Sequence, residues 1–498
     1  MGLISTLSKP YAKWVCKQNS RWINNPIEHQ QKVFNQLIKT AANTRFGKDH
    51  GFEKIDSYES FKKHVPVRDY EDFKVYIDAI LEGEKDVLWK GTPMYLTKTS
   101  GTTSGTKFIP ISKESMPFHL KSAKDALLSY VNETKQTGFI GGKNIFIQGS
   151  PELSDTNGIP TGRLSGIVAH HVPWYLKRNN FPSWKTNTIE DWEKKVDAIV
   201  DETLDQPMSL ISGIPPWVQM YFEKIQNKLS KPVSEIFPDF SLYVYGGVNF
   251  EPYKKRFEEL IGKPIPSIET YPASEGFIAY QDSQDQQGLL LCVNHGIFYE
   301  FIESSSFSEE NPRRISLKDV ELGKDYVIIL NTNAGLWGYN IGDTVRFVST
   351  KPYRLVVTGR IKHYTSAFGE HVIGKEVEDA IKEVIEQHPA VINEFHVAPE
   401  VNPIDGLPYH EWFIEFKTEP KDLLEFAKSL DDFMCSKNSY YSDLIKGKVL
   451  RPLKICRVQS DGFLSMMKCR GKLGGQNKPP RLANNRKLVE HLKPFVYE

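Results

Sequence analysis

Hydroxyl-bearing residues and glycines crowd into one short segment, residues 97–107, which reads Thr-Lys-Thr-Ser-Gly-Thr-Thr-Ser-Gly-Thr-Lys. Glycines let a backbone approach an anion closely, successive N–H groups form a concave nest, and serine and threonine hydroxyls add donors. Such a loop suits a polyphosphate. It is not a Walker A loop, because three residues rather than four separate Gly101 from Gly105 and Lys107 does not follow a glycine. A flexible polar hairpin is the alternative interpretation.

Charged residues at three later turns have the chemistry that a bound nucleotide needs. Glu275, near the end of the run 269–276, can hold Mg²⁺ against phosphate oxygens; a helix cap is the alternative. Asp343 directly follows a glycine and can accept hydrogen bonds from two vicinal ribose hydroxyls, although such a pair is usually only a turn. Arg360 also follows a glycine, and it can meet phosphate or ribose or simply lie on the surface.

A basic, glycine-rich loop lies near the C-terminus, at residues 471–481. It contains Lys472 and Lys478, and either can deliver an ammonium group to a developing negative charge. The surrounding segment Lys446–Glu498 has thirteen Lys and Arg against three Asp and Glu, whereas the whole chain is balanced at 63 against 62. Alone, this segment would indicate nucleic-acid binding. Beside a phosphate loop, it predicts an electropositive wall over a triphosphate.

Helices and strands alternate along the chain and would position these residues. Residues 1 to about 90 have helical periodicity. From Met94 onward, short β-branched or aromatic runs alternate with helical stretches, which is typical of an α/β fold. A new α+β pattern begins after Gly359. We therefore predict an α/β protein with a large N-terminal domain, residues 1–359, and a smaller, mobile α+β C-terminal domain, residues 360–498.

Composition excludes several classes of protein. Over 498 residues, 40% hydrophobic and 12% aromatic residues exclude wholesale disorder, and a net charge of +1 excludes a general polycation. The five cysteines form no CxxC pair, which argues against a disulfide framework or a zinc finger and favours the reducing cytosol. No apolar run approaches the ~18 residues of a membrane span. We expect a cytoplasmic protein with no stable membrane association and no nucleic-acid partner.

The first helix carries a basic stripe, since lysine or arginine recurs at positions 9, 13, 17 and 21. Residues 1–6 also fit the loose myristoylation pattern, so contact with anionic lipid is one interpretation. The favoured interpretation is the solvated face of a packed amphipathic helix. Its inward residues would then be Leu3, Leu7, Trp14 and Val15.

Two other clusters carry less weight. His170 and His171 are adjacent, so their side chains point in different directions, and no further metal-ligand motif flanks them. The aromatic residues around Gly246 can line an apolar acyl pocket or pack in a core, and both interpretations stay open. These aromatic residues are Tyr243, Tyr245, Phe250 and Tyr253.

In their order along the chain, these segments resemble the motifs of the adenylate-forming superfamily. The closest resemblance is to the Gretchen Hagen three family of acyl-acid amido synthetases, an auxin-responsive family known from plants and also found in bacteria. It extends from about residue 10 to 495 and rests on the matching segments 99–105, 271–275, 339–343 and 475–481. The stretch 362–370, after the proposed hinge, is similar to the bacterial members.

The resemblance implies site residues for ATP and Mg²⁺. Asp343 would bind the ribose, Arg360 would lie at the hinge beside the nucleotide, and Glu275 would assist Mg²⁺. Lys478 would stabilise the adenylation transition state, and Lys472 is the alternative lysine. The remaining nucleotide-binding residues would be Ser100, Gly101, Thr102, Thr103, Ser104, Gly105, Tyr271 and Ser274.

The implied activity is a two-step ligation that works by domain rotation. A carboxylic acid attacks the α-phosphate of ATP to give an acyl-adenylate, and an amine, typically an amino acid, then displaces AMP. The enzymatic alternative is an acyl-CoA synthetase of the same superfamily, which would use a thiol acceptor. A different class of alternative is a protein that binds nucleic acid or an anionic surface through its basic C-terminal segment.

Overall fold

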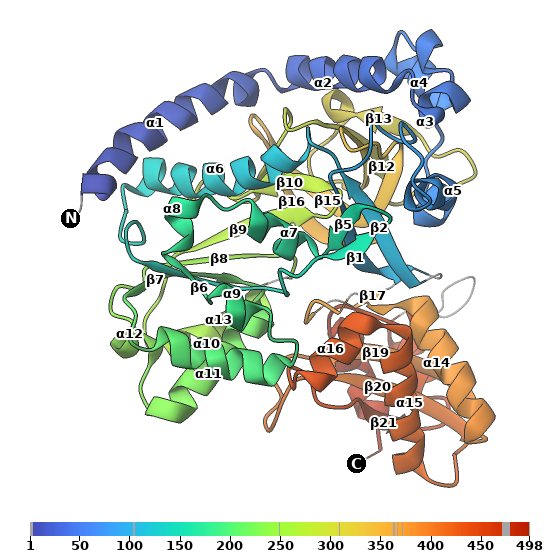
Figure 1. The fold of residues 1–498 in the computed structure, drawn as a ribbon. Coiled ribbons are helices and arrows are strands. Elements are labelled where there is room, and N and C mark those ends of the chain that lie inside the picture. The colour runs from blue at the N-terminus through green and yellow to red at the C-terminus, as the bar shows by residue number, and fades with distance from the viewer. Residues whose placement is uncertain are drawn as a thin grey trace.

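A row of helices opens the chain and covers one end of the molecule (Figure 1). The computed structural model describes residues 3–102, 105–248, 250–307, 309–361, 364–365, 367–370, 372–470 and 479–497. Asp69 begins the fifth helix with a capping box, in which its carboxylate accepts from the backbone of Glu71 and Asp72. The helices are α1 (Leu3–Asn24), α2 (Pro26–Ala41), α3 (Arg45–Asp49), α4 (Tyr58–His64) and α5 (Tyr70–Leu81).

The first helix packs against α6 along a narrow stripe. Val15 and Trp22 are buried there, and Asn19 donates a hydrogen bond of 2.9 Å to the Asp125 carboxylate of α6. The expectation that Leu7 and Trp14 point inward is wrong, because both are more than half exposed. A helix that contacts one neighbour buries only one stripe, and these two residues lie on another side of it.

A small sheet carries the hydroxyl-rich segment at its tip. Its strand order is β2-β1-β5-β4, and β1 pairs antiparallel with β2 and parallel with β5. The four strands are β1 (Tyr95–Thr102), β2 (Gly105–Ile111), β4 (Ser154–Thr156) and β5 (Ile159–Gly162).

A twelve-stranded mixed sheet forms the centre of the large lobe. Strands β9, β8, β7, β3 and β6 are parallel neighbours, whereas the strands from β13 to β10 pair antiparallel. In sheet order the strands are β13 (Arg314–Ser316), β12 (Ile297–Glu303), β14 (Asp325–Thr332), β15 (Tyr339–Thr350), β16 (Tyr353–Arg360), β11 (Leu289–Leu291), β10 (Gly276–Tyr280), β9 (Ser267–Ala273), β8 (Leu242–Gly246), β7 (Met208–Gly213), β3 (Lys143–Ile147) and β6 (Asn180–Phe181).

Helices cover both faces of the parallel part of this sheet, as the α/β prediction requires (Figure 1). Helix α6 lies on one face, and α10, α11 and α13 lie on the other. The helices of this region are α6 (Met116–Thr134), α7 (Leu164–His170), α8 (Trp174–Lys177), α9 (Trp184–Asn187), α10 (Trp192–Thr203), α11 (Pro215–Leu229), α12 (Val233–Ile236) and α13 (Glu251–Ile261).

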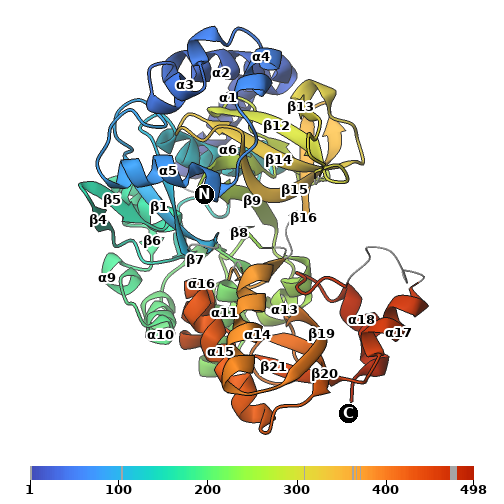
Figure 2. The ribbon, with the colours of Figure 1, turned by 90° about the vertical axis from the view of Figure 1, so that its right-hand side faces the viewer.

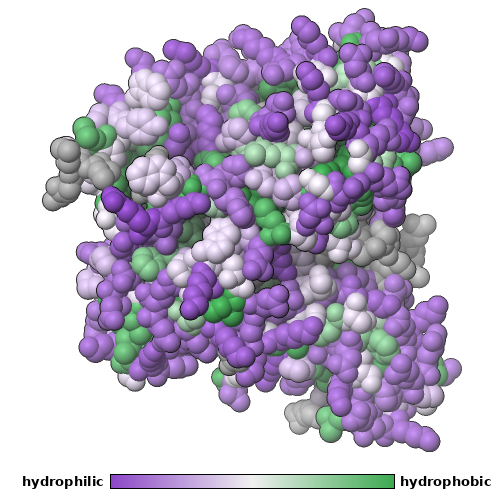
Figure 3. All heavy atoms as spheres, in the orientation of Figure 1, coloured by the Kyte–Doolittle hydropathy of each residue, from purple (hydrophilic) through white to green (hydrophobic). Residues whose placement is uncertain are grey.

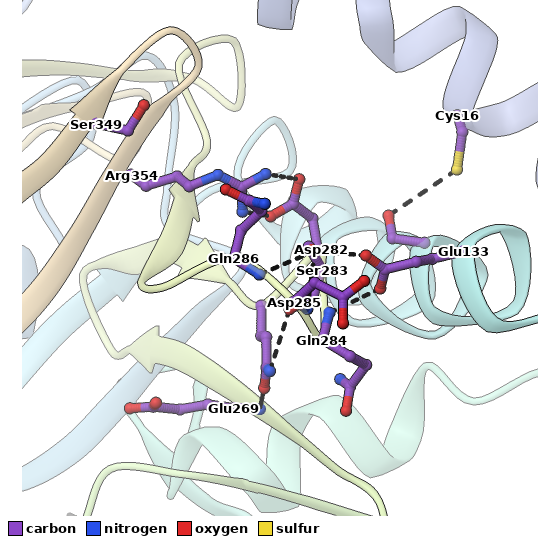
Figure 4. A network of polar contacts seen from close by, with 12 residues as sticks. Cys16, Glu133, Glu269, Asp282, Ser283, Gln284, Asp285, Gln286, Ser349 and Arg354 are labelled. Carbon is purple, nitrogen blue, oxygen red and sulfur yellow. Dashed lines mark hydrogen bonds and ion pairs between the residues drawn. The ribbon is translucent and has the colours of Figure 1, made fainter.

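A polar network fastens the β10–β11 connection to its neighbours (Figure 4). Arg354 of β16 holds Asp282 with two hydrogen bonds, and both side chains are largely buried. Glu133, at the end of α6, accepts from the Ser283 hydroxyl and, at 2.7 Å, from the Gln284 backbone. Burial raises the pKa of Asp282 although Arg354 opposes the shift. The network links the β10–β11 connection to α6 and β16, so its role is structural.

The smaller lobe lies beside the large one and has its own three-stranded sheet, β19-β20-β21 (Figure 2). Strands β19 and β20 are antiparallel, and β21 is parallel to β20. Its elements are β17 (Tyr364–Thr365), β18 (Val372–Ile373), α14 (Gly374–Gln387), β19 (Val391–Glu400), β20 (Tyr409–Thr418), α15 (Leu423–Lys437), α16 (Ser439–Lys446), β21 (Lys454–Val458), α17 (Gly462–Cys469) and α18 (Lys487–Leu492). The predicted fold class, α/β with a large N-terminal part and a smaller C-terminal α+β part, is confirmed.

A buried carboxyl in the first turn of α14 gives the small lobe a pH-dependent stability. Glu376 accepts hydrogen bonds from the Ile373 backbone at 2.9 Å and from the Asn438 amide at 3.1 Å. Burial raises the pKa of Glu376 to about 7 from its ordinary value of 4.5. The folded state therefore binds this proton more tightly than the unfolded state, and the free energy of unfolding falls as pH rises through that window.

We expect Glu376→Gln to remove this loss of stability. A glutamine still accepts hydrogen bonds but never ionises, so its benefit over the wild type should grow from pH 5 to pH 8, by on the order of 2 kcal/mol. Urea denaturation at both pH values measures this difference. Glu386→Gln, at an exposed position of the same helix, is the matched control. An equal pH dependence for wild type and Glu376→Gln would contradict the prediction.

Candidate functional site

The hydroxyl-rich segment forms the tip of the β1–β2 hairpin. Thr102 pairs with Gly105 across the tip, so both strands extend further than the sequence suggests. Thr103 and Ser104 lie outside the described residues. Strand β1 includes Ser100, Gly101 and Thr102, and β2 begins at Gly105. Much of the segment that the sequence suggested as a loop is therefore paired as a hairpin.

Three predicted residues meet at one carboxylate. Asp343 of β15 accepts a hydrogen bond of 2.5 Å from the Tyr271 hydroxyl of β9 and another of 2.5 Å from Nε of Arg360. Asp343 and Arg360 are also direct partners in the β15–β16 register. Only 8% of Asp343 is exposed. Residues that are distant along the chain thus hold one carboxylate in a fixed orientation.

Glu275 and Ser274 lie in the turn that joins β9 to β10, next to this cluster. The helix-cap interpretation of Glu275 is wrong, because a strand follows it. Burial raises the pKa of Glu275, and the neighbouring Asp343 adds to the rise, whereas Lys107 and Arg360 oppose it. The turn follows the carboxyl end of β9, where the parallel part of the sheet meets the antiparallel part. Ligands of open α/β sheets bind at this kind of edge.

Two site residues were missed by the sequence interpretation. Lys107 of β2 lies near Glu275 and 5.7 Å from the centre of the Tyr70 ring. Its position at the end of the hydroxyl-rich segment was the available signal. The Tyr339 hydroxyl is buried and has no hydrogen-bond partner within the described part of the chain, and Glu275 is among the groups that raise the pKa of Tyr339. A polar ligand beside Glu275 would provide the missing partner.

The donors and acceptors present fit a nucleotide with a divalent cation. Asp343 offers a carboxylate for hydroxyl groups, and Lys107 and Arg360 offer positive charge for phosphate. Mg²⁺ is usually held by one or two carboxylates together with substrate phosphates, and Glu275 would supply one such carboxylate. No group of three or more His, Cys, Asp or Glu side chains with metal-binding geometry occurs among the residues that the structure describes.

The small lobe docks against the strand that leads to the hairpin tip. Tyr440 of α16 donates a hydrogen bond of 3.2 Å to the backbone oxygen of Lys98 in β1. Arg163, which follows β5, pairs with Asp443 at 2.5 Å and lies 4.3 Å from the centre of the Tyr440 ring. The lobes therefore touch beside the candidate site.

A second contact joins the lobes through α13. The Tyr253 hydroxyl donates a 2.6 Å hydrogen bond to the backbone oxygen of Ala367, and Phe368 belongs to an apolar cluster that continues into the large lobe. The Tyr243 hydroxyl likewise donates to Gly213, at 3.0 Å. Tyr243 and Tyr253 are buried and belong to the same apolar cluster as Phe257, so the structure favours the core interpretation for these two tyrosines. Tyr245 and Phe250 are only partly buried, and both interpretations stay open for them.

The remaining predicted residues either lie away from this cluster or fall outside the residues that the structure describes. Lys472 and Lys478 fall within 471–478, which lies outside the described residues. Directly after it, Arg481 pairs with Glu378 and Glu394 within the small lobe. His170 and His171 contact different partners, the Pro151 backbone and the Tyr95 hydroxyl.

Family models match three consecutive parts of the chain. The N-terminal domain of the GH3 family matches residues 16–195, its central domain residues 290–360 and its C-terminal domain residues 375–487. The chain belongs to the GH3 family. This confirms the resemblance to the Gretchen Hagen three family that the motifs indicated.

Known GH3 proteins are distant from the chain in sequence. The indole-3-acetic acid-amido synthetase GH3.3 of Arabidopsis thaliana is 24% identical over 94% of this chain and 91% of its own length. The jasmonoyl–L-amino acid synthetase JAR4 of Nicotiana attenuata is 23% identical over 64% of this chain and 66% of its own length. The solved structure of the GH3.15 acyl acid amido synthetase superposes with a TM-score of 0.61 at 17% identity, and covers 97% of this chain and 96% of that one. This likeness shows a shared fold.

Proposed function

We propose that this GH3 protein is an acyl-acid amido synthetase, an ATP-dependent ligase that adenylates a small carboxylic acid and transfers the acyl group to an amine, most simply an amino acid. The match of all three GH3 domain models, in order, carries this proposal. Relatives over nearly the whole chain are named amido synthetases. The cluster around Asp343, with acceptors for hydroxyl groups and cations for phosphate, suits the first half-reaction.

ATP would lie between the β1–β2 hairpin of the small sheet and the β9–β10 turn of the large sheet. Asp343 would accept hydrogen bonds from the ribose, next to Tyr271 and Arg360, which already orient it. Glu275 would hold Mg²⁺. The hairpin tip would enclose the phosphates through Ser100, Gly101, Thr102, Thr103, Ser104 and Gly105, with Ser274 from the β9–β10 turn nearby.

Bound ATP supplies an α-phosphate that the substrate carboxylate attacks, with pyrophosphate as the leaving group. Both reactants are anions, so the protein must mainly supply positive charge and fixed dipoles. Lys107 and Arg360 provide this charge within the described site, and Lys478 would add it from the small lobe. The raised pKa of Glu275 fits a carboxyl whose ionised form requires a nearby cation.

The small lobe would be a mobile domain, residues 360–498, hinged at Arg360 on residues 1–359. Its contacts with Lys98 and Arg163 are polar, which suits an interface that breaks and reforms during turnover, whereas the apolar contact through Phe368 would also have to open. We also propose that the chain is a bacterial-type member, since its stretch after the hinge is similar to bacterial relatives, and that it works in the cytoplasm. In the described part of the chain, no helix has the length and apolar character needed to cross a bilayer.

Pyrophosphate exchange with ATP, Mg²⁺ and a panel of carboxylic acids tests the first half-reaction. We expect exchange that depends on one class of acid. Adding amino acids or coenzyme A to the productive mixture then identifies the acceptor, and we expect an amide. An acyl-thioester without any amide would overturn the amine acceptor, and binding to nucleic acid without pyrophosphate exchange would overturn the ligase proposal.

A further inference from the structure

The outer side of α1 combines exposed apolar side chains with cations. Leu7, Tyr11 and Trp14 are 57%, 45% and 56% exposed, and their spacing places them on one side of the helix. The Tyr11 and Trp14 rings stack with their centres 6.0 Å apart. Pale and green side chains accordingly gather among purple ones at the upper left of Figure 3, where Figure 1 places α1.

The charges of α1 all have one sign. Lys9, Lys13, Lys17 and Arg21 recur at four-residue intervals, and the helix contains no Asp or Glu. None of the four forms an ion pair with a carboxylate among the described residues. Lys13, Lys17 and Arg21 are exposed, and Lys9 is half-buried. The cations therefore form a stripe next to the apolar side chains.

The inner side of α1 is already occupied, so its orientation is fixed. The Ser5 hydroxyl is hydrogen-bonded to that of Thr137 at 2.7 Å, and Asn19 to Asp125 at 2.9 Å, while Trp22 is buried near the end of the helix. These contacts attach both ends of the helix to the large lobe. The apolar and cationic stripes must then face away from the protein.

We propose that α1 binds an anionic membrane surface from the side, lying in the interface without crossing it. Tryptophan and tyrosine favour the headgroup level, leucine can enter the acyl boundary, and lysine and arginine meet anionic headgroups. A second copy of the chain fits less well, because a two-fold contact would place like charges against one another. The basic and aromatic side chains of α1 therefore favour a negatively charged lipid surface over a second copy of the chain.

Co-sedimentation of the full-length protein with vesicles tests this proposal. We expect binding to vesicles of equal parts phosphatidylcholine and phosphatidylglycerol, no binding to phosphatidylcholine alone, and release at about 0.5 M NaCl because salt screens the charges. No sedimentation with the anionic vesicles would overturn the proposal.

Two double variants of α1 test the contributions of the cationic and the apolar stripe to vesicle binding separately. We expect Lys13→Glu/Lys17→Glu and Leu7→Ser/Trp14→Ser each to lower the apparent vesicle affinity about tenfold or more. Ile404→Ser/Leu424→Ser, which replaces two exposed apolar residues of the small lobe, should bind like the wild type. Thermal unfolding and pyrophosphate exchange should be unchanged in all three variants.

Two outcomes of these experiments would contradict a membrane role for α1. If both α1 variants kept the affinity of the wild type, another surface would bind the vesicles. If size-exclusion chromatography showed a dimer that Leu7→Ser/Trp14→Ser converted to a monomer, the face would be an interface between copies.

Discussion

Asp343→Ala is expected to raise the KM for ATP in pyrophosphate exchange by at least about 100-fold. The carboxylate is buried, and Tyr271 and Arg360 hold it at 2.5 Å each. If it binds the ribose, its removal deletes two hydrogen bonds to a charged acceptor, each contributing about 1.5–3 kcal/mol. It also removes the ion pair between Asp343 and Arg360. The turnover number at saturating ATP should fall less, because the ribose is remote from the reacting phosphate.

Asp325→Ala is the matched control. Asp325 of β14 pairs with Arg346 of β15 through two hydrogen bonds of 2.9 and 2.7 Å, so it resembles Asp343 in chemistry and lies on a neighbouring strand. The pair is exposed, however, and should contribute little to stability. We expect an unchanged KM for ATP. An equal KM in Asp343→Ala and the wild type would remove Asp343 from the nucleotide site.

The residues of the site cluster could be named from the sequence because the order of the motifs resembles the adenylate-forming superfamily, whereas each local signal alone left a turn or a surface residue as the alternative. Tyr271 lies in a strand run before a turn, and Asp343 and Arg360 each follow a glycine, so strands and turns could be placed from pattern alone. Their convergence could not be derived from any one segment. It depends on β9, β15 and β16 belonging to the same sheet, and sheet order is set by long-range pairing.

The contacts between the lobes could not be predicted. Arg163 and Asp443 are 280 residues apart, and neither lies in a motif. Val15 of α1 is buried as expected, but Leu7 and Trp14 were placed inward wrongly for a similar reason: both are apolar, and hydrophobicity alone does not tell which side of a helix meets its neighbour. Lys107 could not be assigned to the site because its nearness to Glu275 arises only when β2 and the β9–β10 turn come together. In each case the sequence did not show which segments contact one another in the folded protein.

Lys478→Ala is expected to lower the rate of adenylation by about 100- to 1000-fold while ATP binding stays measurable. A lysine that stabilises charge only in the transition state affects turnover more than ground-state binding, and the loss of one such donor commonly has this magnitude. The segment around it is strongly basic, with thirteen Lys and Arg against three Asp and Glu from Lys446 to Glu498, so general attraction of ATP should survive the loss of a single charge.

Lys472→Ala tests whether the effect of Lys478 on adenylation depends on its specific position or only on its positive charge. Both lysines lie in the same glycine-rich stretch of the sequence and each variant removes one positive charge, so a purely electrostatic role of this stretch predicts equal, small effects for the two. A specific catalytic role predicts a large effect for Lys478 alone. Rates of single-turnover acyl-adenylate formation, compared with ATP affinity from equilibrium binding, distinguish these cases. A large effect at Lys472 and none at Lys478 would reverse the assignment, and small effects at both would transfer the catalytic charge to Lys107 and Arg360 within the large lobe.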